Sequence, residues 1–238
     1  MPGYALTVAD TGMKETWDAA ASSDHVDAYV GDPATARAEL DGFLGRLGDD
    51  GRGGTCVEVG CGPGRMTGLL AERFDWVVAV DVSGEMLELA RSRANAPNVD
   101  FRLVGGEQLD SVEDGIANVV VCYLVLQHFP ERRLVVAYLR EFARVLAPGG
   151  CAFVQLPVMQ QGFRSSLWRA LRRLAVPLAT RLRDDVAAQA EYRGVRLNQP
   201  ELEAALAGAG LRVAARDESS DSPYRYAREV FLRLERAV

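Results

Sequence analysis

From Thr55 onward, short apolar runs rich in valine alternate with amphipathic stretches. Apolar runs of this length predict strands buried on both faces of a parallel sheet, and the amphipathic stretches between them predict helices. We expect strands near 55–60, 76–81, 99–104, 118–123 and 150–156, and helices near 64–74, 84–94 and 131–146. Alternating strands and helices of this kind predict an α/β fold with a Rossmann-like sheet and helices on both faces.

The second half of the chain carries further boundary signals. Ala147-Pro148-Gly149-Gly150 predicts a helix stop and a turn into the next strand, since proline cannot continue a helix. A last helix is expected at about 199–208, ending before Gly210, with two final strands at about 211–217 and 228–235.

Two segments stand outside the alternation, one at about 13–47 with helical periodicity and one at 157–198. The second interleaves apolar residues with arginines between Arg164 and Arg183, which predicts one or two amphipathic helices. We therefore interpret residues 1–238 as a single domain with four parts: an N-terminal helical lid (1–47), a core (55–157), a helical cap insertion (157–198) and a last helix with the final strands (199–238).

Composition narrows the possible partners. The net charge of -6 and the pI of about 5.1 provide no positive field that would collect nucleic acid or an anionic membrane. Neither a leader-like apolar region within Met1–Trp17 nor a run of ~18 apolar residues is present, which predicts a cytoplasmic protein. The four cysteines lack CxxC spacing and the chain has two histidines, so we expect buried reduced thiols and no metal.

A glycine loop follows the first predicted strand, in the run Gly60-Cys61-Gly62-Pro63-Gly64-Arg65. Glycine permits positive φ and lets a ligand approach the backbone where a Cβ would block it. A dinucleotide-binding loop requires G-x-G-x-x-G, but position 65 is arginine and the third glycine comes one residue early. The spacing argues against an oxidoreductase and favours a cofactor without a pyrophosphate.

Asp81 ends the next predicted strand, 21 residues after Gly60. An acidic side chain at this position can accept hydrogen bonds from both hydroxyls of a ribose and disfavours a 2′-phosphate. The alternative is that Asp81 caps the helix beginning near Gly84. The glycine loop and Asp81 together favour a nucleoside-containing cofactor.

With these residues in place, the sequence closely resembles the class I S-adenosylmethionine-dependent methyltransferases of the small-molecule type. Four blocks carry the resemblance in the order found in that family: VEVGCGPGR (57–65), VDVSGEML (80–87), NVVVCYLVLQHF (118–129) and RVLAPGG (144–150). It covers about 55–157 and, more loosely, 199–238. It implies a seven-stranded sheet of order 3-2-1-4-5-7-6 whose last strand is antiparallel, and S-adenosyl-L-methionine as cofactor, with S-adenosyl-L-homocysteine as product.

The resemblance also implies roles for individual residues. Asp81 would bind the ribose, Met86 would contact the adenine face and Val82 would pack beside that ring. Tyr123 would lie beside the transferred methyl group. The methionine moiety would be held by Glu58 and by the loop residues Gly60, Cys61, Gly62 and Gly64.

Two positions depart from the family pattern. Where Gly-Asp-Ala is common at the adenine edge, this chain has Val104-Gly105-Gly106, followed by Glu107. Either the backbone at Gly105 and Gly106 recognises the adenine, or Glu107 reaches round to it. Asn118 replaces the usual aspartate at the start of the fourth strand, and we interpret it as structural.

His128 is the candidate general base. Methyl transfer from a sulfonium requires alignment and exclusion of water, and a hydroxyl or ammonium acceptor also requires a base. Histidine is suited to that role near neutral pH, and His128 lies just past a carboxyl strand end. The alternative is that His128 orients its loop or the cofactor. Trp17 and Tyr29 could either close over the methionine carboxylate or pack in the core, whereas His25 is interpreted as a surface residue.

The acceptor remains open at this level. Cys122-Tyr123-Leu124-Val125 lacks the prolines typical of enzymes that methylate nucleic-acid amino groups, which favours a small molecule over nucleic acid. The arginine-rich face within 157–198 is either solvated or binds an anionic, partly hydrophobic or carrier-tethered acceptor. We predict O- or N-methylation in specialised (natural product) metabolism. The alternatives are C-methylation of a quinone-like acceptor, tRNA methylation, and a cofactor-binding regulatory or partner protein without turnover.

Overall fold

The computed structural model describes most of the chain, and the fold is drawn from those parts. They are residues 12–22, 33–48, 52–160, 194–220, 222 and 226–237. The predicted cap helices fall largely on 161–193, which lie outside the described residues. Tyr29 and His25 also lie outside the described residues, within 23–32.

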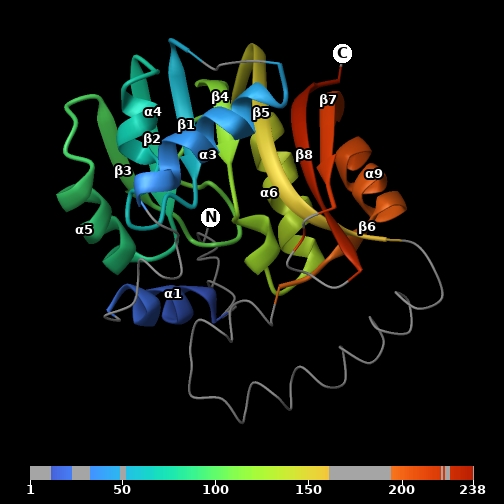
Figure 1. Ribbon diagram of the computed structural model, residues 1–238, viewed down its shortest axis with the longest axis horizontal. Helices are drawn as coiled ribbons and strands as arrows, with labels where there is room; N and C mark the ends of the chain where they lie inside the picture. The colour runs from blue at the N-terminus through green and yellow to red at the C-terminus, as the bar shows by residue number, and fades with distance from the viewer. Residues whose placement is uncertain are drawn as a thin grey trace, which may run out of the picture.

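Within the described residues, the centre of the fold is one eight-stranded sheet (Figure 1). Its strands run in the order β3-β2-β1-β4-β5-β8-β7, and the short β6 pairs with β5. The strands are β1 (Thr55–Val59), β2 (Trp76–Asp81), β3 (Val99–Leu103), β4 (Ala117–Cys122), β5 (Leu146–Met159), β6 (Leu197–Asn198), β7 (Leu211–Ser219) and β8 (Ala227–Arg236).

Strand directions agree with the expected topology. The pairs among β1 to β5 are parallel, whereas β8 is antiparallel to both β5 and β7. This confirms the order 3-2-1-4-5-7-6 with an antiparallel last strand, to which the two-residue β6 is an addition.

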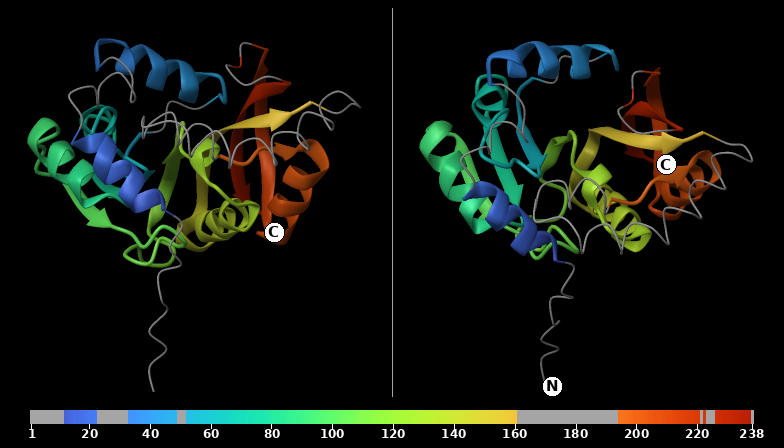
Figure 2. Two further views of the ribbon diagram at one scale, coloured as in Figure 1. Left: turned by 90° about the horizontal axis from the view of Figure 1, so that it is seen from below. Right: turned by 60° about the horizontal axis from the view of Figure 1, so that its bottom comes forward.

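Helices cover both faces of the sheet (Figure 2). Leucine and phenylalanine side chains of α3 (Pro33–Gly45), α4 (Thr67–Ala71) and α5 (Gly84–Arg93) pack with Val77 and Val119 on one face. The other face is covered by α6 (Arg132–Val145) and α9 (Gln199–Gly208). Because valine lines both faces of the central strands, the sheet is buried on both sides, as the apolar runs predicted.

The predicted helix at 64–74 is too long. Gly64 has φ +83°, which an α-helix does not accommodate, so the chain turns through residues 62–66 and α4 begins only at Thr67. The predicted helical stretch at 13–47 contains α1 (Met13–Ala21) and α3, and residues 23–32 between them are not described.

The predicted turn at 147–150 is also wrong. Helix α6 ends at Val145 and β5 begins directly at Leu146, so Pro148 and Gly149 lie inside the strand as an irregularity. The pairing with β4 shifts register between Ala117 and Val119, and Gly149 takes φ +79°. The proline still cannot continue α6, but the chain resumes pairing without a separate turn.

Candidate functional site

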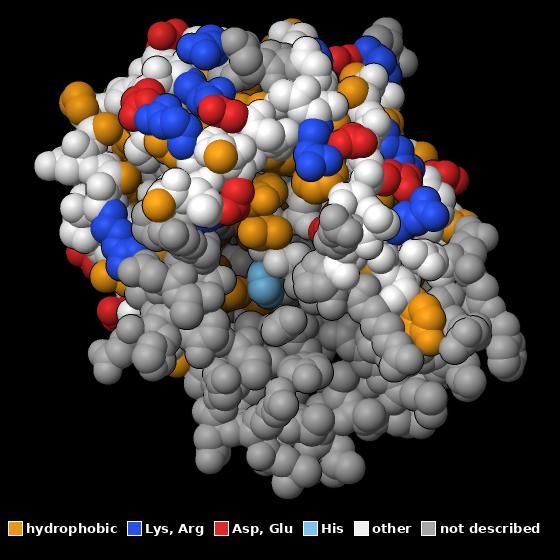
Figure 3. Space-filling model, in the orientation of Figure 1, with side chains coloured by type: hydrophobic (Ala, Val, Ile, Leu, Met, Phe, Trp, Pro, Cys, Tyr) orange, Lys and Arg blue, Asp and Glu red, His pale blue; other side chains and the backbone are white. Residues whose placement is uncertain are grey.

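A cavity of about 310 Å³ opens at the carboxyl edge of the sheet, where the loops after β1, β2 and β4 meet. Figure 3 shows hydrophobic side chains and a histidine gathered in a hollow on this face. Open α/β sheets bind ligands at this edge. Ten of the predicted site residues line the cavity: Trp17, Glu58, Gly60, Cys61, Gly62, Asp81, Val82, Met86, Tyr123 and His128.

The glycine loop needs its glycines for two reasons. Gly60, Gly62 and Gly64 all have positive φ, of 69°, 53° and 83°. A Cβ at Gly60 would lie 2.5 Å from a methyl carbon of Val125, and one at Gly64 would lie 3.0 Å from the backbone of Ala90. Gly64 is not among the residues lining the cavity, and its closeness to Ala90 means that it serves the packing of the loop on α5.

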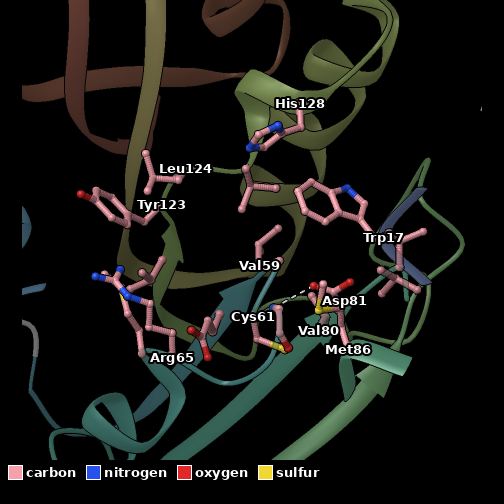
Figure 4. A pocket seen from close by; sticks show the side chains of 18 of the residues that line it. Trp17, Val59, Cys61, Arg65, Val80, Asp81, Met86, Tyr123, Leu124 and His128 are labelled. Atoms are coloured by element: carbon pink, nitrogen blue, oxygen red, sulfur yellow. Dashed lines mark hydrogen bonds between the residues drawn. The ribbon is translucent and has the colours of Figure 1, made fainter. Parts of the chain in front are cut away.

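Asp81 is held across from this loop by two backbone groups. Its Oδ2 accepts a hydrogen bond from the Gly62 N–H, the dashed line in Figure 4. Its Oδ1 accepts one from the Ser83 N–H, and both bonds measure 2.9 Å. Burial raises the pKa of this carboxyl, and the backbone N–H groups around it act in the opposite direction. Each carboxylate oxygen can accept further hydrogen bonds, so the geometry suits a pair of ribose hydroxyls.

Glu58 is the second carboxyl group of the cavity lining and is 5% exposed. Its Oε2 accepts a hydrogen bond of 2.6 Å from the hydroxyl of Thr67, at the start of α4. Burial raises the pKa of Glu58 to about 8, the charge of Asp81 adds to the rise and the Thr67 hydroxyl opposes it. A buried acid of this kind is suited to a cationic partner, which would restore its ionised form.

His128 and Trp17 meet at one side of the cavity, although 111 positions separate them. Their rings pack edge to face, with centroids 5.1 Å apart and planes at 86°. In Figure 4 the Trp17 ring lies on the side opposite Tyr123, with His128 beside it. His128 ends the 3₁₀ turn Leu126–His128, and its Nε2 lies 3.1 Å from the side-chain nitrogen of Gln127.

The residues expected at the adenine edge lie outside the cavity lining. Gly105 N–H donates to Asp110 Oδ1 at 3.1 Å, and the Glu107 carboxylate pairs with Arg133 at 2.5 Å. A Cβ at Gly106, which has φ +85°, would lie 3.1 Å from a methyl carbon of Val82. The Gly105 N–H and the Glu107 carboxylate each have a partner in the protein, so both alternatives for adenine recognition stay predictions.

Arg65 is a lining residue that the sequence interpretation missed. Its guanidinium, 7% exposed, donates to Glu39 at 2.6 Å and to the Thr35 hydroxyl at 3.0 Å. Burial acts to raise the pKa of Glu39, but hydrogen bonds from Arg65, Thr35 and Tyr123 bring it below its usual value. Arg65 directly follows the glycine loop, and this position could have predicted that it lines the cavity.

Leu124 was also missed, and it lines the cavity in a strained conformation. Its φ is +60°, and its side chain is 37% exposed beside Tyr123 (Figure 4). The Leu124 N–H donates to Gln155 Oε1 at 3.0 Å, and the Gln155 side-chain nitrogen donates to Glu229. A carboxylate only accepts, so Glu229 sets the direction of the Gln155 amide. No local sequence pattern predicts these hydrogen bonds, because Leu124, Gln155 and Glu229 are far apart in the chain.

The cysteines and Asn118 occupy the positions expected of structural residues. All four cysteines are free and buried, and burial raises the pKa of Cys56, Cys61 and Cys122, which confirms the prediction of buried reduced thiols. Asn118 accepts a hydrogen bond of 2.8 Å from the Thr55 N–H, in keeping with a structural role.

Neither a metal-ligand cluster nor a membrane-spanning helix occurs among the described residues. No group of three or more His, Cys, Asp or Glu side chains lies close enough to hold a metal ion. In the same parts of the chain, every helix is too short or too polar to cross a bilayer.

Known proteins resemble this chain mainly over the core that carries the cavity. Residues 56–150 match a family model described as a methyltransferase domain. The N-demethylindolmycin N-methyltransferase of Streptomyces griseus is 37% identical over 95 residues, which are 39% of this chain and 40% of that protein. The ubiquinone biosynthesis O-methyltransferase of Xanthomonas campestris pv. campestris (strain B100) is 32% identical over 104 residues, 43% and 42% of the two chains.

A solved structure extends the likeness beyond the core. The S-adenosylmethionine-dependent methyltransferase of Leishmania major superposes with a TM-score of 0.65 at 14% identity, covering 93% of this chain and 80% of that one. Residues 56–150 are therefore similar to a methyltransferase domain, and the fold of the chain is similar to that of an S-adenosylmethionine-dependent methyltransferase. The matched region spans less than half the length of the two curated relatives described above.

Proposed function

We propose that the protein is an S-adenosylmethionine-dependent methyltransferase that methylates an oxygen or nitrogen atom of a small molecule. The observation that carries the proposal is a single cavity that joins the glycine loop, two buried carboxyl groups and His128. Its volume of about 310 Å³ is at the lower end of the range for small-ligand sites.

The two carboxyl groups would bind different parts of the cofactor. Asp81, fixed by the backbone of Gly62 and Ser83, would accept the ribose hydroxyls. Glu58, buried and hydrogen-bonded by Thr67, would pair with the ammonium of the methionine moiety. Gly60, Cys61 and Gly62 would lie along that moiety, while Gly64 would support the loop.

The adenine would lie at the far end from His128. Met86 is buried at the first turn of α5 and lines the cavity with Val82, so these side chains would contact the ring. Either the backbone of Gly105 and Gly106 or the Glu107 carboxylate, which pairs with Arg133, would recognise its edge.

When bound, S-adenosylmethionine would supply a sulfonium methyl group for in-line transfer to an aligned nucleophile, with S-adenosylhomocysteine as the leaving group. His128 would accept the proton of a hydroxyl or ammonium acceptor at an imidazole nitrogen, and Tyr123 would lie beside the reacting methyl group. Trp17 packs against the imidazole and limits its orientations. Trp17, Leu124 and Phe129 would exclude water from this end.

The acceptor would be partly hydrophobic. The end of the cavity near His128 is lined by Trp17, Leu124, Phe129 and Tyr138, which suit a planar or apolar group. The N-demethylindolmycin N-methyltransferase and the ubiquinone biosynthesis O-methyltransferase are both named for small molecules, which supports a small-molecule acceptor. The first of them also supports a role in specialised metabolism. The arginine-rich segment within 157–198 would add selectivity for an anionic or carrier-tethered acceptor.

Calorimetric titration tests cofactor binding without knowledge of the acceptor. S-adenosylhomocysteine and S-adenosylmethionine should bind stoichiometrically, and nicotinamide dinucleotides should not. Dinucleotide binding without S-adenosylhomocysteine binding would overturn the proposal.

An acceptor panel tests turnover. Phenols, hydroquinones and heteroaromatic amines are incubated with S-adenosylmethionine, and release of S-adenosylhomocysteine is measured, because that product forms whatever the methylated atom. Tight cofactor binding with no product from any acceptor class, tRNA included, would favour the alternative of a cofactor-binding partner protein.

A further inference from the structure

Helix α1 is attached to the loop that holds Asp81 by a carboxylate that has no assigned role. Asp18 Oδ1 accepts a hydrogen bond of 2.6 Å from the Ser83 hydroxyl. The backbone N–H of Glu85, in the first turn of α5, also hydrogen-bonds the Asp18 side chain. Asp18 thus lies at the N-terminus of a ten-residue helix, where the unpaired N–H groups favour an anion.

The direction of the bond between Asp18 and Ser83 follows from the other bonds of the serine. Ser83 is fully buried, and its hydroxyl oxygen accepts the Met86 N–H at 3.1 Å as the N-cap of α5. The single hydroxyl proton is therefore donated to Asp18. The Ser83 N–H donates to Asp81, so one serine joins α1, α5 and the predicted ribose carboxylate.

Asp18 is also held as an anion. Partial burial acts to raise the pKa of Asp18, but hydrogen bonds from Lys14 and Ser83, together with the charge of Lys14, bring it below its usual value. Lys14 is half-exposed and pairs with Asp18 one turn along the helix, without reaching Ser83. The bond to Ser83 is the shielded one, and the bond to Lys14 faces solvent.

Helix α1 also contacts His128, through the residue next to Asp18. Trp17, next to Asp18 in the chain, lines the cavity and packs edge to face on the imidazole. Helix α1 has nine residues, and its N-cap, Gly12, makes no side-chain capping bond. So short a helix is not stable by itself, and its position depends on what it packs against. Met13 and Ala20 of α1 pack on the core, and the contacts of Asp18 add the polar attachment that fixes where the Trp17 ring lies.

We propose that Asp18 is a positioning residue that couples the ribose loop to His128. Through Ser83 it docks α1 beside Asp81, and through α1 it holds Trp17 against the imidazole. This inference rests on the proposed function, in which Asp81 binds the ribose hydroxyls and His128 serves the acceptor. Because the Ser83 N–H also donates to Asp81, loss of the Asp18 contact should weaken cofactor binding as well as release His128.

The test uses proton NMR of the imidazole, which is simple because the chain has two histidines. A His25→Gln variant identifies the signal of His128, and Trp17→Leu gives its position without the indole ring current. In the free protein, Asp18→Ala should move the His128 signal toward its position in Trp17→Leu. Asp18→Asn should restore most of the shift, since its amide oxygen can accept the Ser83 hydroxyl. Lys14→Gln, the matched control on the exposed side, should leave the signal unchanged.

The second measurement on the same variants is their affinity for S-adenosylhomocysteine. Calorimetry with S-adenosylhomocysteine should show about tenfold weaker binding for Asp18→Ala, the size expected when a charge-assisted hydrogen bond is lost. Ser83→Ala removes the bond from its other partner and should displace the His128 signal in the same direction, which keeps the test intact if Asp18→Ala does not fold.

The possible outcomes are separable. An unchanged His128 signal in both Asp18→Ala and Ser83→Ala overturns the inference, as does wild-type affinity in both. If the wild-type protein fails to bind S-adenosylhomocysteine, the proposed function fails, whereas the NMR comparison in the free protein still decides whether Asp18 positions His128.

Discussion

Replacing Glu58 by glutamine removes one ionisable group from the cavity and keeps its size and its hydrogen bond from Thr67. Burial raises the pKa of Glu58 from 4.5 to about 8, with Asp81 adding to the rise. At pH 7, about nine-tenths of the free protein therefore carries a proton on this carboxyl. Pairing with the ammonium of a bound cofactor requires the ionised form, so binding must release that proton.

The predicted quantity is about 0.9 proton released per S-adenosylhomocysteine bound at pH 7, falling to about 0.1 at pH 9. Calorimetry in buffers of different ionisation enthalpy measures it directly, because the observed heat changes with the buffer in proportion to the protons released. The apparent affinity should rise about tenfold per pH unit below pH 8 and level off above it. Glu58→Gln should bind more weakly and release only the protons that come from the ligand or other groups.

The same shift predicts how stability depends on pH in the free protein. A carboxyl with a raised folded-state pKa binds more protons folded than unfolded between pH 4.5 and about 8, so stability falls as pH rises through that window. The upper bound on this loss is about 5 kcal/mol at 1.36 kcal/mol per pKa unit. Denaturant unfolding at pH 5 and pH 8 should show a larger loss for the wild type than for Glu58→Gln.

Two results would refute this reasoning. One is equal proton release by the wild type and Glu58→Gln at pH 7. The other is an identical pH dependence of their unfolding free energies. Either would mean that Glu58 is ionised in the free protein and that its burial is offset by contacts beyond Thr67.

Three further predictions concern the rest of the site. His128→Ala should bind S-adenosylhomocysteine like the wild type and lose about 10²–10⁴-fold in turnover with an acceptor found in the panel, and full turnover would remove the base hypothesis. Gly60→Ala should destabilise the protein and abolish cofactor binding in calorimetry, whereas Gly42→Ala, in open space on α3, should stabilise it by about 0.5–1 kcal/mol; equal effects would contradict the loop argument. Gln155→Leu should cost about 1–3 kcal/mol in denaturant unfolding because it removes the acceptor for the Leu124 N–H, and an unchanged midpoint would show that this bond contributes nothing.

The fold class and the centre of the site could be predicted from local patterns. Valine-rich runs separated by amphipathic helices require a parallel sheet, and parallel strands with right-handed crossovers bring their carboxyl ends to one edge. That rule predicts that the glycine loop, Asp81 and His128 lie at one edge of the sheet, and all three line one cavity in the structure. Boundaries were less predictable where the backbone is irregular, as at Gly64 and Pro148, because a positive φ or a bulge leaves no periodic signal.

The amino-acid sequence by itself determined the order of the apolar strands, the carboxylate of Asp81 at the end of β2 and the glycine loop that precedes it. Only the tertiary structure decided which distant side chains meet. Asp18 reaches Ser83 across 65 positions, and Trp17 reaches His128 across 111. Such pairs depend on how α1 docks on the folded core, and no local spacing encodes that docking, because it arises from burial and hydrogen bonding summed over contacts with several elements.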